Sequence, residues 1–448
     1  MDYLIADVYA RWRRSLGDEV RVSAGADEHG TKVAEKAAEA GQTPQEFVDG
    51  LRGDFQNLIE KLNTPYEDYV RTSSPEHVRR VQEIWRRLQP YIYKSTYVGW
   101  YCSGCEAFLT ESEAREADYK CADHAKPLEK VSEENYYLRV SEFGDRIREA
   151  IDSGEMKILP KWRAKEILAL IGERAADVSI SRPAEKLSWG VPVPDDPTQT
   201  MYVWVDALSN YITVLGYPDG DISEWWPATL QVVGKDILRF HAIIWPAMLL
   251  GLGLPLPRTI LSHGFITIDG AKMSKSIGNV VDPIEALERH GTEAFRYYFL
   301  RHVSTFDDGD FTWAKFDSAY NELANDLGNL VQRLAVMCEK YGAGGVKVDE
   351  ARDEEFAGLM GEFRFSEAFE YAWGKVQAIN KRIDETKPWE VAKNDPEKVI
   401  ELLGELTGEI MGAARLLAPF LPETAEKVIE LFQAEKIVPP EVPLFPKS

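Results

Sequence analysis

The alternation of hydrophobic and polar residues has a helical period in some segments of this chain and a strand-like period in others. Residues 1 to about 93 combine a helical pattern at YLIADVYARW, a strand-like EVRVSAG and a second helix from about Thr31. Strand-like segments return at MYVWV and TLQVVG, each before a helical pattern, with Asp206 and Asp236 where N-caps are expected. This order predicts an α/β fold with one open parallel sheet, interrupted by an insertion, rather than two independent sheets.

From about Asp317 the apolar positions recur at helical spacing. Two stripes predict the core of a helical bundle: Leu323, Leu327, Leu330 and Leu334, then Phe369, Ala372, Val376, Ile379 and Ile383. Pro388 stops the second stripe. The final VPPEVPLFPKS is expected to lie extended over the surface.

These patterns divide the chain into six regions. We expect the first half of an α/β domain at 1–93, an insertion at 94–200, the second half of the α/β domain at 201–260, a loop and connecting region at 261–316, a helical domain at 317–438 and a tail at 439–448. The insertion is the least regular region, and GVPVPDDP breaks it near its end.

Composition narrows the class of protein. The 448 residues are 44% hydrophobic, as in a globular chain of several domains, and no apolar run reaches the roughly 18 residues of a membrane span. The N-terminus lacks the basic and then apolar order of a secretory signal. Four cysteines, with Cys338 alone, fit a reducing compartment, so we expect a cytoplasmic protein without membrane contact.

The net charge of −22 excludes a protein that binds polyanions with its whole surface. Local basic clusters could still meet a nucleic acid, although solvated helix faces are the simpler interpretation: Arg11, Arg13 and Arg14; Arg79, Arg80, Arg86 and Arg87; Lys157, Lys161, Arg163 and Lys165. Charge alone leaves the partner undecided.

Three cysteines and one histidine have the spacing of a zinc site. Cys102 and Cys105 form a C-x2-C pair, and Cys121 and His124 form a C-x2-H pair after fifteen intervening residues. Three thiolates and one imidazole complete a tetrahedral site with no open position, so the sequence predicts one structural Zn²⁺. Cysteines that bind no metal are the alternative.

The segment SAGADEHGTK runs from a strand through a turn into a helix that starts near Gly30 and Thr31. Ligands of doubly wound sheets bind outside the carboxyl ends of the strands, so Asp27 could hold a ligand ammonium there. The order Gly30-Thr31-Lys32 is wrong for a G-K-[ST] phosphate loop. A helix cap explains the segment as well as a binding site does.

Two helix starts predict a pocket for a small apolar side chain. Ala207 and Tyr211 share a helix face, with Trp204 just before them, and Ile237 and His241 repeat this spacing in the next unit. For each residue taken singly, a packing role is the alternative.

The loop DGAKMSKSIGN places Lys272 and Lys275 between Gly270 and Gly278. Lysines on a hinged loop suit the stabilisation of charge that develops on a triphosphate. A surface loop with two solvated lysines is the alternative.

KMSKS at 272–276 is similar to the second signature of class I aminoacyl-tRNA synthetases. Its surroundings resemble the methionyl-tRNA synthetases in the same order along nearly the whole chain: GADEHGTK, WYCSGCEAF, SWGVPVP, YVWVDALSNY, GKDILRFHAIIWPA, HGFITIDGAKMSKSIGN, DGDFTW and KPWEVAK. The resemblance implies a doubly wound, Rossmann-like sheet with a zinc-knuckle insertion and a C-terminal α-helical anticodon-binding bundle.

The resemblance also implies a reaction: L-methionine is activated by ATP, with Mg²⁺, to methionyl-adenylate and then transferred to the 3′-terminal adenosine of tRNA(Met), initiator and elongator. It assigns the methionine ammonium to Asp27 and the methionine side chain to the pocket residues Trp204, Ala207, Tyr211, Ile237 and His241. It assigns ATP to Gly234, Lys235, Asp236, Lys272, Ser274 and Lys275, with Lys272 and Lys275 catalytic. Trp389 matches the anticodon-stacking tryptophan, and Asn325, Asn329 and Arg333 match the anticodon-reading helix.

Two departures from the family change the expectations. The family's C-terminal dimerising extension is absent, so we expect a monomer. None of the histidines forms the first signature, H-x-G-H: they stand at 29, 77, 124, 241, 263, 290 and 302. Met1 falls just after the expected place of that signature and of the first strand, so we expect a truncated or mis-started gene and an uncovered sheet edge.

Three functions remain open from the sequence. The first is a methionine–tRNA ligase. The second is a synthetase-like protein that keeps the scaffold and binds tRNA and zinc but has lost catalysis together with H-x-G-H. The third is a related class I enzyme for another amino acid.

Overall fold

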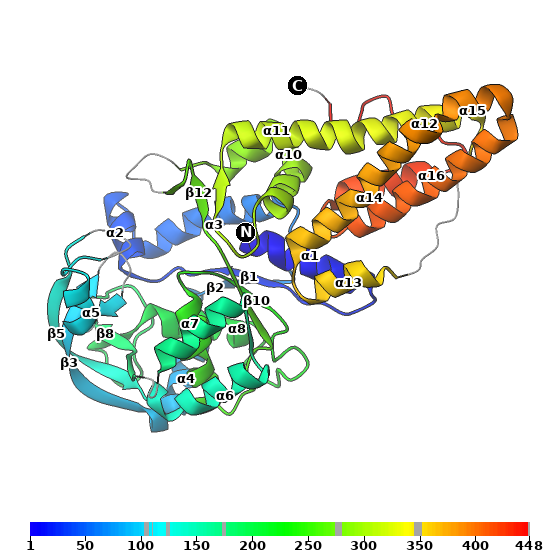
Figure 1. Cartoon of the computed structure of the whole chain (residues 1–448). Helices are drawn as coiled ribbons and strands as arrows, with labels where there is room; N and C mark the ends of the chain where they lie inside the picture. The colour runs from blue at the N-terminus through cyan, green and yellow to red at the C-terminus, as the bar shows by residue number, and fades with distance from the viewer. Residues whose placement is uncertain are drawn as a thin grey trace.

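The computed structural model describes residues 1–102, 107–109, 111–121, 126–172, 176–273, 280–344 and 352–446. Figure 1 shows an α/β part and an elongated helical part that contains the C-terminal helices. Among the described residues, no helix combines the length and the apolar character needed to cross a membrane.

The first region holds two parallel strands and four helices. They are α1 (Asp2–Ser15), β1 (Ser23–Ala26), α2 (Thr31–Glu39), α3 (Pro44–Lys61), β2 (Asp68–Arg71) and α4 (Pro75–Leu88). Helix α2 begins at the residue that the sequence pattern predicted. Helix α3 begins with a capping box, in which the Thr43 side chain accepts from the Glu46 amide and Glu46 accepts from the Thr43 amide.

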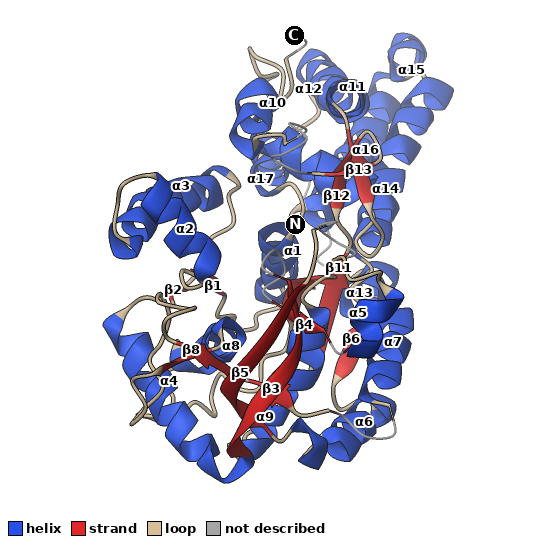
Figure 2. Ribbon diagram, turned by 90° about the vertical axis from the view of Figure 1, so that its left-hand side faces the viewer, coloured by secondary structure: helices blue, strands red, loops and turns tan. Residues whose placement is uncertain are grey.

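The insertion is built on a long antiparallel pair that Figure 2 shows side by side, β3 (Ile92–Cys102) and β5 (Glu129–Leu138). A four-stranded sheet has the order β4-β3-β5-β7. The other elements are β4 (Ala107–Leu109), α5 (Glu111–Glu116), α6 (Gly144–Ser153), β6 (Lys157–Leu159), α7 (Lys161–Ile171), β7 (Val178–Ser179), β8 (Ser181–Pro183) and β9 (Gln199–Met201).

The next region returns to parallel pairing around the buried strand β11 (Thr259–His263). It contains α8 (Val203–Thr213), β10 (Gln231–Gly234), the π-helix η3 (Phe240–Ile244) and α9 (Trp245–Gly251). Then come β12 (Ile266–Ile268), β13 (Ala271–Lys272), α10 (Pro283–Tyr297), the π-helix η4 (Tyr298–His302) and β14 (Gly309–Phe311). Strands β13, β12 and β14 form a small sheet of their own.

The C-terminal region is helical, as its periodicity predicted. It contains α11 (Trp313–Leu323), the π-helix η5 (Ala324–Gly328), α12 (Asn329–Tyr341), α13 (Glu354–Gly361), α14 (Phe365–Thr386), α15 (Pro388–Asn394), α16 (Pro396–Leu417) and α17 (Pro422–Gln433). Every residue of the two predicted stripes is at most 2% exposed. Helix α14 ends before Lys387, which has φ 43°, and Pro388 begins the next helix.

The predicted extended tail lies against the helices. The Phe445 side chain is 8% exposed and reaches Gly328, and the Tyr320 hydroxyl donates to the Pro446 carbonyl at 2.5 Å. The tail therefore belongs to the packed surface of the bundle.

The parallel strands lie in two sheets, so the prediction of a single sheet is wrong. β1 pairs with β2, whereas β11 pairs with β10 on one side and with β6 on the other. Among the described strands, no ladder joins β1 to β10. Periodicity identifies strands, but it does not identify which edges meet, because strand pairing is a long-range interaction.

The predicted strand MYVWV is mostly helix. Strand β9 ends at Met201 and α8 already begins at Val203, with Tyr202 at its N-cap. Asp206 therefore lies inside the first turns and does not cap α8. Val203 and Val205 lie on the buried face of the helix. A short apolar run is compatible with a buried strand and with a buried helix face, so the pattern could not distinguish them.

Candidate functional site

The turn after β1 presents Asp27 at the carboxyl end of the strand. The Asp27 side chain is exposed, whereas the two following residues are buried. Gly30 has φ 119° and donates its amide to the Trp189 carbonyl at 3.1 Å, so a conformation that favours glycine fixes the start of α2. Gly25 allows close pairing, because a Cβ there would lie 2.8 Å from the Val70 carbonyl oxygen.

Three of the five predicted pocket residues, Trp204, Tyr211 and His241, meet between α8 and η3. The Tyr211 hydroxyl and His241 Nε2 are 2.9 Å apart, and the His241 ring meets the Trp204 ring edge-on with centroids 6.0 Å apart. His241 Nδ1 lies 3.1 Å from the Ile237 carbonyl oxygen. The structure adds Phe240, which stacks on Trp204 at 4.1 Å and which the sequence pattern did not identify.

Ala207, the fifth pocket residue, lies one turn before Tyr211 on α8 and is 7% exposed. The pair therefore occupies one helix face, as the spacing predicted.

The pocket is uncharged near neutral pH. Burial lowers the pKa of His241 to about 4, and burial raises the pKa of Tyr211 well above its ordinary value. A neutral imidazole that donates from Nδ1 to the Ile237 carbonyl must accept at Nε2, so the Tyr211 hydroxyl is the donor between the two rings. This arrangement offers aromatic surface without a formal charge, which suits an apolar side chain.

The predicted nucleotide residues lie at the carboxyl end of β10. Gly234 ends the strand and Asp236 is exposed in the turn that follows. A Cβ at Gly234 would lie 2.8 Å from Asp236 Oδ1, so this close approach favours glycine. Asp236 precedes η3 by several residues and is not its N-cap, contrary to the capping prediction.

Lys235 is held by an ion pair beside the same turn. Its Nζ lies 2.6 and 2.7 Å from the two carboxylate oxygens of Asp308 and 4.4 Å from the centre of the Phe265 ring. The hydrogen bond from Lys235 lowers the pKa of Asp308, in spite of some burial. This pair connects β10 to the loop before β14.

The KMSKS loop is described only at its base. The backbone of Lys272 pairs with Thr267 across β12 and β13, and the Gly270 amide donates to Asp310 Oδ1 at 2.7 Å. Ser274 and Lys275 lie outside the described residues. The described part therefore shows only that the base of this segment belongs to a small sheet and is bonded to Asp310.

Two of the four predicted zinc ligands are described. Cys102 and Cys121 are 2% and 6% exposed and belong to one small buried cluster with Ala114 and Leu128. Cys102 pairs with Ala107 across β3 and β4, and the Cys121 amide donates to the Lys126 carbonyl at 2.8 Å. Cys105 and His124 lie outside the described residues, and among the described ones alone no group of three metal-binding side chains occurs.

The predicted anticodon residues lie on exposed surface of the helical part. Asn325, Asn329 and Arg333 are exposed along η5 and α12, and Arg333 Nη2 is 2.8 Å from Asp384. Trp389 on α15 is 38% exposed, which is unusual for a tryptophan that only packs. Helices α12 and α15 are in contact.

A group of buried polar residues next to Asp27 was missed by the sequence patterns. Asp206 is buried between His29 and His77, at 2.6 and 2.8 Å, instead of capping α8. Glu28 is paired with Arg71 at 2.8 Å. No local signal identifies these partners, because each comes from a different part of the chain.

Most of the basic clusters are neutralised within the chain, in agreement with the simpler interpretation. Arg11 pairs with Asp7 at 2.9 Å, Arg14 pairs with Glu67 at 2.6 Å, and Arg80 pairs with Asp219 at 2.8 Å. Paired side chains of this kind make a poor polyanion-binding surface.

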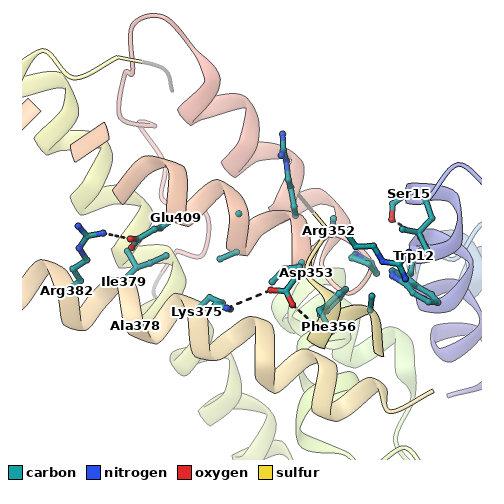
Figure 3. A pocket seen from close by; sticks show the side chains of 18 residues that line it. Trp12, Ser15, Arg352, Asp353, Phe356, Lys375, Ala378, Ile379, Arg382 and Glu409 are labelled. Carbon is teal, nitrogen blue, oxygen red and sulfur yellow. Dashed lines mark hydrogen bonds and ion pairs between the residues drawn. The ribbon is translucent and has the colours of Figure 1, made fainter. Parts of the chain in front are cut away.

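A cavity of about 930 Å³ lies away from these candidate residues (Figure 3). Helices α1, α13, α14 and α16 line it, with Trp12, Phe356 and Ile379 among its apolar side chains. Its charges are largely paired, as Lys375 with Asp353 and Arg382 with Glu409 show. The cavity contains none of the predicted catalytic or binding residues.

Sequence comparison places these features in a known context. Residues 1–335 match the family of tRNA synthetases class I (M). A methionine–tRNA ligase of Caldanaerobacter subterraneus is 40% identical over 447 residues, covering 95% of this chain and 69% of the relative. One of Thermotoga maritima is 36% identical, covering 97% of this chain and 72% of the relative.

Two solved structures of the Mycobacterium tuberculosis methionyl-tRNA synthetase are similar in fold. The structure bound by methionyl-adenylate has a TM-score of 0.92 at 33% identity and covers 99% of this chain and 96% of the other. The free-state structure has a TM-score of 0.82 at 30% identity, with coverage of 100% and 94%. The present chain thus superimposes better on the adenylate-bound arrangement.

Proposed function

The chain belongs to the class I tRNA synthetases (M), and we propose that it is a methionine–tRNA ligase. It activates L-methionine with ATP and transfers the methionyl group to the 3′-terminal adenosine of tRNA(Met), initiator and elongator. The observation that carries this proposal is the neutral aromatic pocket of the half-buried Trp204 and Tyr211 and the buried His241, which fits a thioether side chain. No observation favours the catalytically inactive alternative.

The first step needs positioning more than covalent chemistry. The methionine carboxylate oxygen attacks the α-phosphorus of ATP, a P–O bond forms, and pyrophosphate leaves with the electrons of the broken bond. We propose that Asp27 holds the ammonium while the pocket on α8 holds the side chain, so that the carboxylate is aimed at the phosphorus.

The nucleotide side of the site is built from two loops. We propose that Gly234, Lys235 and Asp236 face the ATP ribose, and that Lys272, Ser274 and Lys275 face the triphosphate. The two lysines stabilise the charge that develops on the leaving pyrophosphate. Mg²⁺ enters with ATP and supplies further charge neutralisation. In the second step the ribose hydroxyl of tRNA attacks the adenylate carbonyl, and AMP leaves.

The test is methionine-dependent exchange of pyrophosphate into ATP by this chain, followed by charging of tRNA(Met). We expect exchange to depend on methionine, with leucine and valine as poor competitors. Exchange that is driven by either competitor would support the enzyme for another amino acid. An absence of exchange together with retained tRNA binding would support the inactive, tRNA- and zinc-binding alternative.

We also propose that Cys102, Cys105, Cys121 and His124 hold one structural Zn²⁺. The described half of this set supports the proposal, since two buried thiols, one at the end of β3 and one between α5 and β5, share one small cluster. Such a cluster has little apolar core of its own, and a closed tetrahedral site would hold the insertion together. The metal takes no part in the reaction.

Replacing Cys102 by serine is expected to abolish stoichiometric zinc binding, because a hydroxyl is a poor ligand where a thiolate is needed. Zinc content by mass spectrometry of the native protein measures the loss, and faster proteolysis within 92–138 measures the loosening. Cys338→Ser is the matched control, since Cys338 is buried in the helical part and should leave the zinc in place. Unchanged zinc in Cys102→Ser would exclude this ligand.

The helical part is proposed to read the anticodon of tRNA(Met). The exposed Trp389 offers a stacking surface for an unpaired base, and Asn325, Asn329 and Arg333 offer donors on the neighbouring helix. Single-stranded bases are read by stacking and edge contacts, which need no basic molecule overall.

For Trp389→Ala we expect KM for tRNA to rise about 5- to 150-fold, since stacking contributes about 1–3 kcal/mol per base. Methionine-dependent exchange should stay at the parent rate, because α15 lies at the end of the helical part that points away from the α/β part (Figure 1). Ile400→Ala is the control, as Ile400 is a comparably exposed apolar residue, at 43% against 38%. Equal losses in exchange and charging would refute the anticodon role.

We further propose a cytoplasmic monomer, on the small number of cysteines in the sequence. Sedimentation at several concentrations tests the monomer.

A further inference from the structure

The turn that carries Asp27 is held in place by the two buried residues that follow it, Glu28 and His29. Glu28 and His29 are 4% and 7% exposed, whereas Asp27 is exposed at the same edge. Buried polar side chains need partners, so each of these two must be bonded inside the protein. The position of the exposed Asp27 carboxylate therefore depends on the internal contacts of Glu28 and His29.

Glu28 is bonded through both its side chain and its backbone. Its carboxylate accepts from Arg71 Nε at 2.8 Å and from the Ser73 hydroxyl. Its amide donates to Thr72 Oγ1 at 2.9 Å, and its carbonyl accepts from Trp189 Nε1 at 2.6 Å. These contacts attach the turn to the segment that follows β2 and to the insertion.

His29 is hydrogen-bonded to Asp206, and Asp206 is hydrogen-bonded in turn to His77. His29 Nδ1 lies 2.6 Å from Asp206 Oδ2, and His77 Nε2 lies 2.8 Å from Asp206 Oδ1. His77 Nδ1 lies 2.8 Å from the Thr213 hydroxyl. The carboxylate can only accept, so both imidazoles donate to it.

These three residues join three separate elements: the turn after β1, helix α4 and helix α8. Asp206 is 1% exposed, and its neighbour Ala207 and Tyr211 belong to the side-chain pocket. Burial alone would raise the pKa of Asp206, but the hydrogen bonds from His29 and His77 outweigh it and keep that pKa below its ordinary value. The carboxylate therefore stays ionised as a double acceptor in the interior.

We propose that the His29–Asp206–His77 triad is a positioning device that sets the distance between Asp27 and the pocket on α8. This inference rests on the proposed role of Asp27 as the partner of the methionine ammonium. Since the ammonium and the thioether are two ends of one substrate, a fixed separation between their sites selects the α-amino acid. None of the three triad residues touches the substrate.

The test compares methionine with its deaminated analogue, which keeps the thioether and the carboxylate but lacks the ammonium. Asp206→Asn keeps the volume but can accept from only one imidazole. We expect KM for methionine to rise about 10- to 100-fold, as for other residues that orient a binding group. KM for ATP and the inhibition constant of the deaminated analogue should stay within about twofold of the parent.

A second pair of variants distinguishes the loss of a hydrogen bond from a general loss of folding. In His29→Asn the amide nitrogen stands near the place of Nδ1 and can still donate to Asp206, whereas His29→Leu removes the donor. We expect His29→Asn to retain the preference for methionine and His29→Leu to behave like Asp206→Asn, at equal thermal stability of the two His29 variants. If both His29 variants fail alike, the hydrogen bond is not the cause and the proposal is overturned.

The outcomes separate the triad from the proposed function. If Asp206→Asn weakens methionine, ATP and the analogue equally, the triad has only a structural role. If Asp27→Asn removes the preference for methionine while Asp206→Asn keeps it, Asp27 binds the ammonium and the triad proposal fails. If Asp27→Asn itself keeps the preference, the assignment of Asp27 fails.

Discussion

Replacing Asp27 by asparagine is expected to lower kcat/KM for methionine in pyrophosphate exchange by about 30- to 150-fold. A charge-assisted hydrogen bond to the ammonium contributes about 2–3 kcal/mol, and asparagine keeps the shape but loses the charge. The effect should fall on methionine and leave KM for ATP unchanged, because Asp27 follows β1 whereas the nucleotide residues follow β10.

Asp221→Asn is the control for this prediction, since it removes another exposed carboxylate from a loop without candidate site residues. It should retain parent kinetics. A loss of ATP affinity that matches the loss of methionine affinity in Asp27→Asn would show that the turn, rather than the carboxylate, had been disturbed.

Replacing Arg296 by methionine is expected to destabilise the fold by about 3–5 kcal/mol. It removes one of the two guanidinium partners of the buried Asp7 carboxylate and the donors of two backbone carbonyls. Arg296 is fully buried, and its Nη2 lies 2.7 Å from Asp7 Oδ2. It also donates to the Phe420 carbonyl at 2.7 Å and to the Pro419 carbonyl at 3.0 Å. One guanidinium thus joins α1 to the end of α16.

Urea unfolding measures this loss as a lower midpoint at unchanged slope. The double variant Asp7→Leu/Arg296→Met should recover part of the stability, because it also removes the buried carboxylate that has lost one of its two cationic partners. Arg364→Met is the matched control: its ion pair with Glu367 is at the surface, so the change should stay below about 1 kcal/mol. Equal losses at positions 296 and 364 would contradict the central role of the buried pair.

The contact between α1 and the helical part could not be read from the sequence. Helix α1 precedes β1 and was expected to belong to the α/β domain, yet Leu4, Ile5 and Val8 share one core with residues of α14 and α16. Amphipathic periodicity shows that a helix has a buried face, but it is silent on what covers that face. The six domain boundaries accordingly stay predictions.

Local signals succeeded where the chemistry itself is local. The start of α2 at Thr31 and the stop at Pro388 follow from glycine and proline conformations. The segment around Trp204 was misassigned, because a short run of valines and aromatics satisfies a strand and a buried helix face equally well. Burial in the tertiary structure selected the helix.

In the candidate site, too, local spacing predicted some contacts, whereas contacts between distant segments were not predicted. Helical spacing alone paired Ala207 with Tyr211 and Ile237 with His241, and the structure brings His241 of the second pair against Tyr211. The Asp206 contacts span 177 and 129 residues, and no sequence period extends over such distances. Motif order identified the family, but it did not identify what holds the motifs in place.

By itself, then, the sequence determined the family and the reaction class, and it predicted which residues meet each substrate, because these depend on short motifs with defined chemistry. Only the tertiary structure decided the separation of the parallel strands into two sheets, the attachment of α1 to the helical part and the burial of Asp206 between two histidines. Each of these follows from packing and desolvation between segments distant in the chain, where a buried charge must find its partner wherever the fold supplies one.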